Sequence, residues 1–150
     1  GKCKESYLRE ACKEYEKRLS RFCQLQVTEL EPVLLPQNPS EKEIAAALEK
    51  EGAELLKRAK GFCIAMCIEG KQLDSTGLAK KLEQAAQGGE NGAVTFLIGS
   101  SYGLADAVKQ RANLRLSMSA MTFPHQLARV MLLEQIYRSY QILSGTKYHK

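Results

Sequence analysis

Two short, continuously apolar segments constrain the fold of this chain more than any other feature of its sequence. Phe62–Ile68 and Ala93–Ile98 have the uniform hydrophobicity of strands that are buried on both faces of a parallel sheet. Segments with helical periodicity lie before, between and after them. This alternation predicts an α/β domain with a mostly parallel sheet flanked by helices.

Apolar spacing and capping residues locate the helices. Ser40 and Glu43 form a capping box in front of one of them, and Gly88-Gly89 stops another. The predicted helices are Leu8–Phe22, Ile44–Ala59, Thr76–Gln87, a segment from after Gly103 to about Ala112, and His125–Leu143. Partial alternation predicts two further strands, Leu25–Leu30 before a proline-containing loop and Leu114–Met121 before the last helix.

The lengths of the apolar runs and the number of cysteines indicate the cellular location of the protein. The longest apolar run has seven residues, whereas a membrane-spanning helix needs roughly 20. The amino end has no apolar signal region, and five cysteines cannot all pair, so we expect a cytoplasmic protein with no membrane association. Cys63 and Cys67 lie in an apolar run without a second ligand pair, which favours core positions over a metal site.

Charge is unevenly distributed along the chain. The net charge is +5, but positions 1–110 hold 16 basic and 16 acidic residues. The whole excess of positive charge lies in the last 40 residues, which contain six basic residues and one acidic residue, Glu134. Such a cationic end is typical of proteins that bind nucleic acid, although a solvated surface gives the same pattern.

Three strand ends are candidate ligand sites, because parallel sheets bind ligands beyond the carboxyl ends of their strands. These are Met66–Gly70, Ile98–Ser100 and Ser119–Pro124. Gly99 allows a ligand to approach the main chain, but a turn needs glycine there for geometry alone. No phosphate-binding loop with its lysine and no complete dinucleotide fingerprint is present in the sequence.

The second half of the last helix is apolar around most of its circumference, so it needs cover on more than one side. A second copy of the chain and an internal position in a three-layer core both satisfy this requirement. His125 at the start of this helix and His149 near the carboxyl end are the two histidines of the sequence.

Several sequence blocks together resemble a known family. They are Ser117–His125 with its Phe-Pro-His, Arg129, Glu134-Gln-Ile-Tyr-Arg138, Tyr148-His149-Lys150, Phe96–Gly99, Glu69-Gly-Lys71 and the opening Gly1–Tyr7. Across nearly the whole chain these blocks are similar to the RlmH family of the SPOUT superfamily, which methylates large-subunit ribosomal RNA.

The resemblance implies a single SPOUT domain over residues 1–150, with a trefoil knot formed by the carboxyl-terminal part of the chain. In this family the knot forms the cofactor site and the homodimer interface. S-adenosylmethionine is the implied methyl donor, and no metal takes part. The implied cofactor-binding residues fall on the three strand ends: Met66, Gly99, Met118, Ser119, Ala120, Met121, Thr122 and Phe123.

The implied acceptor is N3 of a pseudouridine in the 23S rRNA of the assembled 70S ribosome. Five residues are expected to act on it: His149, Tyr148, His125, Arg129 and Arg138. One histidine would take the N3 proton, and we favour His149 because a tail can close over the substrate. The two arginines would bind the developing anion or a phosphate, and Tyr148 would stack on a base.

Two positions depart from the family pattern. Ser100 stands where a second glycine is usual, and the chain begins at the Gly-Lys that ends the family's first strand, so we expect that strand to precede residue 1. Two other functions stay open at this level. One is an RNA- or ribosome-binding module without catalysis, and the other is a small-molecule enzyme whose cationic end binds a phosphorylated substrate.

Overall fold

The computed structural model describes residues 2–150. Helices lie before, between and after the strands, as expected for an α/β protein: α1 (Ser6–Leu19), α2 (Glu41–Arg58), β1 (Phe62–Gln72), α3 (Ser75–Ala85), α4 (Gly89–Gly92), β2 (Val94–Leu97), α5 (Asp106–Arg111), β3 (Leu114–Ser117) and α6 (His125–Leu143). No helix in this part of the chain is both long and apolar enough to cross a membrane.

The three strands form one parallel sheet in the order β2-β1-β3, which confirms the predicted class. Ile64 of β1 stands opposite Phe96 on one side and Leu114 on the other. Asn113 ties the start of β3 to β1, because its side-chain oxygen accepts from the Cys63 amide at 2.8 Å and its own amide donates to the Cys63 carbonyl. β1 is therefore the centre of the sheet.

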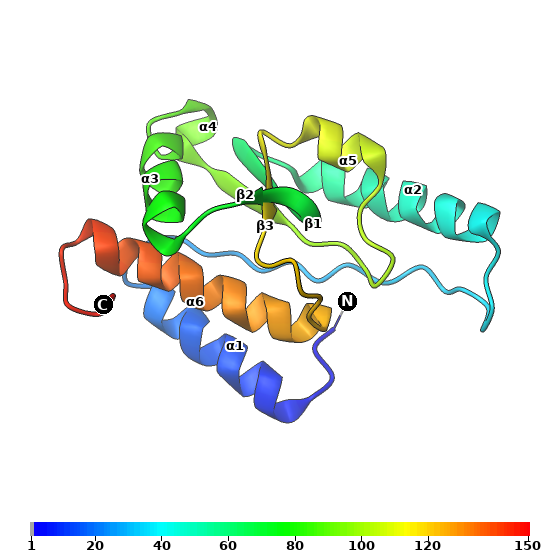
Figure 1. Ribbon diagram of the computed structural model, residues 1–150, viewed down its shortest axis with the longest axis horizontal. Coiled ribbons are helices and arrows are strands. Elements are labelled where there is room, and N and C mark those ends of the chain that lie inside the picture. Colours follow the sequence, from blue (N-terminus) through cyan, green and yellow to red (C-terminus); the bar gives the residue numbers. More distant parts are fainter. Residues whose placement is uncertain (1) are drawn as a thin grey trace.

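Helices cover both faces of this sheet (Figure 1). Ile64 and Leu116 pack with α1, α3 and α6 on one face. Cys63 and Ala65 point to the other face, where they pack with residues of α2 and α5. Alternate residues of β1 thus belong to two cores, which is why the strand is apolar without a break.

α6 is covered by the chain itself along most of its length. α1 and α3 both pack against α6, and Leu132, Leu133 and Ile136 are buried between them and the sheet. The internal position in a layered core therefore accounts for the apolar character of this helix. Leu127 near its start remains 38 % exposed.

β1 runs four residues further than its apolar run indicated and bends into an arch (Figure 1). Leu116 of β3 pairs with Met66 before the arch and with Lys71 after it, so residues 67–70 bulge out of the ladder. Gly70 lies against β3 so closely that a Cβ would come within 2.7 Å of the Arg115 carbonyl. A side chain at this position would push the arch off β3.

Two predicted strands differ from the structure. Leu25–Leu30 is not a strand, because its backbone does not pair with the sheet formed by β1, β2 and β3. β3 ends at Ser117 rather than Met121. The Ser117 hydroxyl donates to the Ser119 carbonyl, and the Ser119 hydroxyl accepts from the Met121 amide, so this segment folds into a turn.

The capping box of α2 has the predicted form. The Ser40 hydroxyl accepts from the Glu43 amide and the Glu43 carboxylate accepts from the Ser40 amide, both at 3.1 Å. We expect Ser40→Ala to lower the free energy of unfolding by about 1 kcal/mol, because the Glu43 amide loses its acceptor. Urea denaturation measures this change, with the exposed Lys42→Ala of the same helix as control. Equal stability of the two variants would contradict the capping role.

Candidate active site

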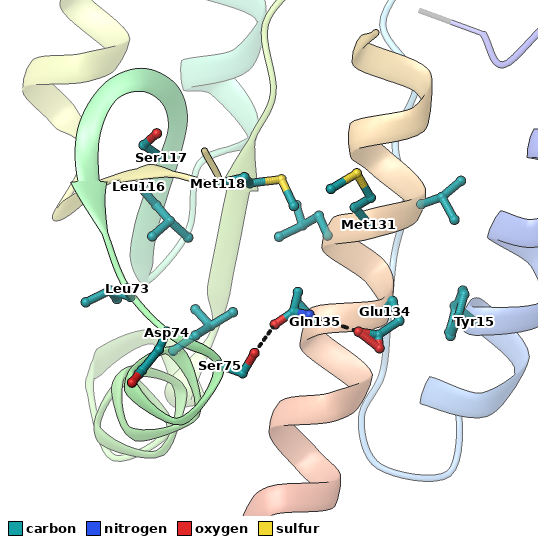
Figure 2. A pocket seen from close by; sticks show the side chains of 13 residues that line it. Tyr15, Leu73, Asp74, Ser75, Leu116, Ser117, Met118, Met131, Glu134 and Gln135 are labelled. Atoms are coloured by element: carbon teal, nitrogen blue, oxygen red, sulfur yellow. Dashed lines mark hydrogen bonds between the residues drawn. The ribbon is translucent and has the colours of Figure 1, made fainter. Parts of the chain in front are cut away.

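A cavity of about 570 Å³ opens between α6, α3 and the carboxyl end of β3. Figure 2 shows Met118 and Met131 facing each other across it, with Ser75 and Gln135 on its wall. Leucine, valine and methionine side chains make most of the lining, and Asp74, Ser75, Ser117, Glu134 and Gln135 supply its polar groups. An apolar cavity with a few converging polar groups is the usual form of a small-molecule site.

The main chain that follows Met118, a residue of the cavity lining, offers hydrogen-bond donors. Within residues 2–150, the amides of Ala120, Thr122 and Phe123 donate no hydrogen bond to the protein. Ala120 and Thr122 are also exposed. Such amides are able to hold the polar edge of a ligand.

The chain returns to α6 after the helix ends. The Gly145 amide donates to the Ile142 carbonyl and the Thr146 amide donates to the Gln141 carbonyl, which is a Schellman motif with Gly145 at φ 72°. The Thr146 hydroxyl donates to the Gln141 side chain at 2.6 Å. This turn sends residues 147–150 back along the helix, so Tyr148 and His149 lie beside it and are half-buried.

Glu134 and Arg138 on α6 bind this returning tail. The Arg138 Nε and Nη2 atoms each donate to the Glu134 carboxylate at 3.0 Å, and the Tyr148 hydroxyl donates to the same carboxylate at 3.3 Å. The guanidinium carbon of Arg138 lies 4.9 Å from the centre of the Tyr148 ring. Its Nη1 lies 3.1 Å from His149 Nδ1. We call Glu134, Arg138, Tyr148 and His149 the tail cluster.

These contacts shift the titration of two members of the cluster. Hydrogen bonding to Glu134 raises the pKa of Arg138, so its charge is retained at every working pH. Burial, followed by the negative charge of Glu134, raises the pKa of Tyr148, which keeps its hydroxyl protonated. Both groups therefore act as hydrogen-bond donors.

The predicted cofactor residues gather at one edge of the sheet. β1, β2 and β3 are parallel, and the register places Ala65 opposite Leu97 and Met66 opposite Leu116. Met66 therefore lies level with Ile98 and Leu116 in the sheet. Gly99 and Met118 lie just beyond this level, after the ends of the two neighbouring strands. Among the predicted residues, Met118 also lines the cavity.

Gly99 is required by its own turn. A Cβ at this position would lie 2.2 Å from the Gly103 carbonyl oxygen, and Ser100 pairs with Gly103 across the turn. The geometric reason for this glycine is thus sufficient by itself. Ser100 is half-buried.

His125 and Arg129 lie away from the tail cluster. His125 begins α6, and thirteen residues of helix separate it from Arg138, which corresponds to about 20 Å. Burial lowers the pKa of His125, and the positive charge of Arg129 acts in the same direction. Arg129 pairs with Glu29 at 3.4 Å. One chain therefore does not bring its two histidines together.

Glu134 and Gln135 belong to the site although neither was among the expected catalytic residues. Glu134 lines the cavity and holds the tail, while the Gln135 amide donates to it at 2.9 Å. The Ser75 hydroxyl donates to Gln135 Oε1 at 2.7 Å. The four-residue spacing of Glu134 and Arg138 on a predicted helix is a sequence signal for such a pair, and the sequence-based expectations above did not use it.

Of the two cysteines expected in the core, Cys63 lies in a core cluster, whereas Cys67 is in neither cluster and lies in the bulge of β1. Cys63 is fully buried and Cys67 is half-buried, and burial is the main reason that the pKa of both thiols is raised. Among residues 2–150, no three histidine, cysteine, aspartate or glutamate side chains are grouped so that they could hold a metal ion.

Comparison with known proteins gives a consistent result over the full chain. The family model described as "Predicted SPOUT methyltransferase" matches residues 1–149. The proteins named ribosomal RNA large subunit methyltransferase H are 49 % identical in Clostridium beijerinckii and 47 % identical in Clostridioides difficile and Streptococcus thermophilus. Each alignment covers 100 % of this chain and 95 % of the relative. The chain therefore belongs to the SPOUT methyltransferases, which use S-adenosylmethionine, and among them to the ribosomal RNA large subunit methyltransferase H family.

Proposed function

We propose that this protein methylates N3 of a pseudouridine in the 23S rRNA of the assembled 70S ribosome, with S-adenosylmethionine as donor. Its relatives are named as methyltransferases of large-subunit ribosomal RNA. The observation that carries the proposal is the position of the tail cluster. Glu134 belongs both to this cluster and to the wall of a cavity that Met118, at the expected cofactor edge, also lines.

The residues present fit the cofactor. The cavity volume lies within the range of small-molecule sites, and the free amides of Ala120, Thr122 and Phe123 suit the edge of a purine. Met66, Gly99 and the segment Met118–Phe123 would hold the cofactor at this edge of the sheet. When bound, S-adenosylmethionine supplies a methyl group on a positively charged sulfonium.

The tail cluster supplies groups for the acceptor base. N3 of the base exchanges its proton for the methyl group, so negative charge develops on the imide as the proton leaves. Arg138 places a permanent positive charge next to the half-buried tail, and Tyr148 adds an aromatic ring that can stack on a base. The role of the protein is to align the reactants and stabilise this charge.

The fold supports three further parts of the proposal. The arch of β1, with β3 paired before and after it, is suited to a trefoil knot through which the carboxyl-terminal part of the chain passes. Ile68, Met121 and Leu127 are exposed apolar side chains near the cofactor segments, and a homodimer would cover them. Residues 1–150 would form one domain that works in the cytoplasm, where the ribosome is found.

Calorimetric titration of S-adenosylmethionine into the protein is the first test, and we expect saturable binding with one site or one-half site per chain. The second step is single-turnover reaction with 70S ribosomes that lack the modification, followed by nucleoside mass spectrometry. We expect N3-methylpseudouridine in the 23S rRNA. Cofactor binding without any methylated nucleoside would contradict the proposed substrate, and ribosome binding without cofactor binding would indicate a passive RNA-binding module.

A further inference from the structure

We propose that Glu134 is a positioning residue that acts through Arg138, and that His149 serves the reaction as a hydrogen-bond donor through its Nε2–H rather than as a base. This inference rests on the proposed function, because it concerns the same tail cluster. It goes further in assigning a role to a residue outside the expected catalytic set and in reversing the role expected for His149.

The contacts of Glu134 account for the position of the tail. Its two carboxylate oxygens accept from Arg138 Nε and Nη2, from the Tyr148 hydroxyl and from the Gln135 amide. Its side chain is 17 % exposed, and that of Arg138 is 25 % exposed. A carboxylate with four donors in a largely enclosed place holds them firmly, because charge-assisted hydrogen bonds are the strong ones.

The orientation of Gln135 is fixed from the opposite wall of the cavity. The Ser75 hydroxyl at the start of α3 donates to the amide oxygen of Gln135, so the amide nitrogen turns toward Glu134 (Figure 2). A continuous chain of hydrogen bonds thus runs from Ser75 through Gln135, Glu134 and Arg138 to His149. Glu134 is its central member, since it accepts from both neighbours.

The contact with Arg138 decides which ring nitrogen of His149 has the proton. A guanidinium has only donors and stays charged in proteins. His149 Nδ1, at 3.1 Å from Arg138 Nη1, must therefore be the acceptor, and the proton of the neutral ring lies on Nε2. The lone pair that a base would use is already engaged. Release of Arg138 would be needed before His149 could take a proton at Nδ1.

The chemistry of the acceptor suits a donor at this place. Hydroxide from solvent removes the N3 proton as water, and the negative charge spreads over the two carbonyl oxygens that flank N3. An N–H aimed at one of these oxygens stabilises the anion before and during transfer. The N3–C bond then forms as the C–S bond breaks, and the electron pair of that bond remains on sulfur as a neutral thioether.

Other titratable groups around the tail do not take over this role. The titratable groups of α6 that contact the tail are Tyr137, Glu134 and Arg138. Tyr15 and Arg18 on α1 contact Tyr137, and the tail itself holds Lys147, Tyr148 and Lys150. Among these, Glu134 is the carboxylate, and its oxygens are occupied by the donors described above. The pH dependence of the chemical step should therefore follow the imide of the substrate.

Substitutions of His149 separate the two roles. Gln retains an N–H donor but has no basic nitrogen, whereas Ala retains neither. In single-turnover methylation of ribosomes at saturating cofactor, we expect His149→Ala to lose about 10²-fold in rate and His149→Gln to stay within about tenfold of the wild type. If His149→Gln is as slow as His149→Ala, the donor role is wrong.

The pH profile gives an independent measurement. With a donor, the logarithm of the rate should rise with pH at a slope near one through neutral pH, in the wild type and in His149→Gln alike. A histidine base would instead produce a plateau, because the rate stops rising once the base is fully unprotonated. A plateau of this kind that His149→Gln abolishes would overturn the inference.

The role of Glu134 is tested by Glu134→Gln, which keeps the shape of the side chain but removes its charge. We expect a fall of kcat with little change in KM, and a loss of the single Nε2–H tautomer of His149 in nitrogen NMR spectra. Glu54→Gln is the matched control, because Glu54 forms the same four-residue pair with Arg58 on α2. An unchanged His149 tautomer in Glu134→Gln would contradict the positioning role. Absence of any methylation by the wild type would instead contradict the proposed function, and the tautomer measurement would still stand.

Discussion

Replacing Arg138 by alanine should lower the rate of methyl transfer by about 10³-fold, the largest effect that we expect from any single change in the site. Arg138 contacts every other member of the tail cluster: Glu134 through two nitrogens, the Tyr148 ring through its face and His149 through Nη1. Removal of one transition-state donor lowers kcat by about 10²–10³-fold. Arg138→Ala also releases the tail, so we expect the upper end of this range.

The same substitution leaves the Glu134 carboxylate without its cation. We expect the free energy of unfolding to fall by about 1–3 kcal/mol, because a mostly buried acceptor loses its partner. Arg138→Lys retains a charge but cannot span both carboxylate oxygens and His149, so its rate should be intermediate. Single-turnover kinetics and urea denaturation measure the two effects. Arg58→Ala on α2 is the control, since Arg58 makes the equivalent pair with Glu54. A folded Arg138→Ala protein with methylation near the wild-type rate would remove the tail cluster from the active site.

Ile64→Ala should be the most destabilising single truncation, with a loss of about 2–5 kcal/mol. Ile64 is completely buried in the central strand and packs in the core formed by α1, α3, α6 and the sheet. Its neighbours on both sides, Phe96 and Leu114, are fixed by the ladder and have little freedom to close the space. The thermal midpoint should fall by about 10 °C for a chain of this length.

Ile68→Ala on the same strand is the matched control. It removes the same atoms from a side chain that is 54 % exposed on the arch of a single chain, so we expect a change of at most about 0.5 kcal/mol at protein concentrations low enough to keep the chain monomeric. Calorimetry or thermal denaturation by circular dichroism compares the two variants. A loss at Ile68 as large as that at Ile64 in the monomer would contradict this comparison, whereas a loss at Ile68 that appears only at higher protein concentration would support the proposed homodimer.

Local signals predicted the helices well. α6 begins and ends at the expected residues, because Pro124 precedes it and an apolar pattern fills it. The capping box located the start of α2 to within a few residues. Both signals act between residues that are neighbours in the sequence, so they need no knowledge of the tertiary fold.

Signals that depend on distant partners were less informative. The Leu25–Leu30 pattern resembles a strand, but strand formation requires a free sheet edge beside it. The extension of β1 beyond Ile68 depends on a second pairing with β3, which no periodicity in residues 69–72 encodes. Ser119 shortens β3 through side-chain hydrogen bonds that compete with the ladder.

The candidate site shows the same division. The strand ends could be located from the sequence because parallel strands place their carboxyl ends at one edge. Arg138, Tyr148 and His149 were expected through family resemblance, together with His125 and Arg129, which lie elsewhere. The assembly of the tail cluster depends on the turn at Gly145, which brings Tyr148 back to Glu134. The tautomer of His149 follows from an interatomic contact, which sequence alone does not contain.

The central position of β1 also affects how the protein folds during its synthesis. Cys63 and its partner Asn113 are 50 residues apart, and β2 too follows β1 in the chain. While the polypeptide is being synthesised, β1 therefore emerges from the ribosome before β2 and β3. Both of its edges stay unpaired until those strands have been made. Such long-range pairing slows folding and leaves edge-to-edge aggregation as the competing reaction. Folding of this enzyme is thus governed by its last third, which completes the sheet that the first two thirds can only begin.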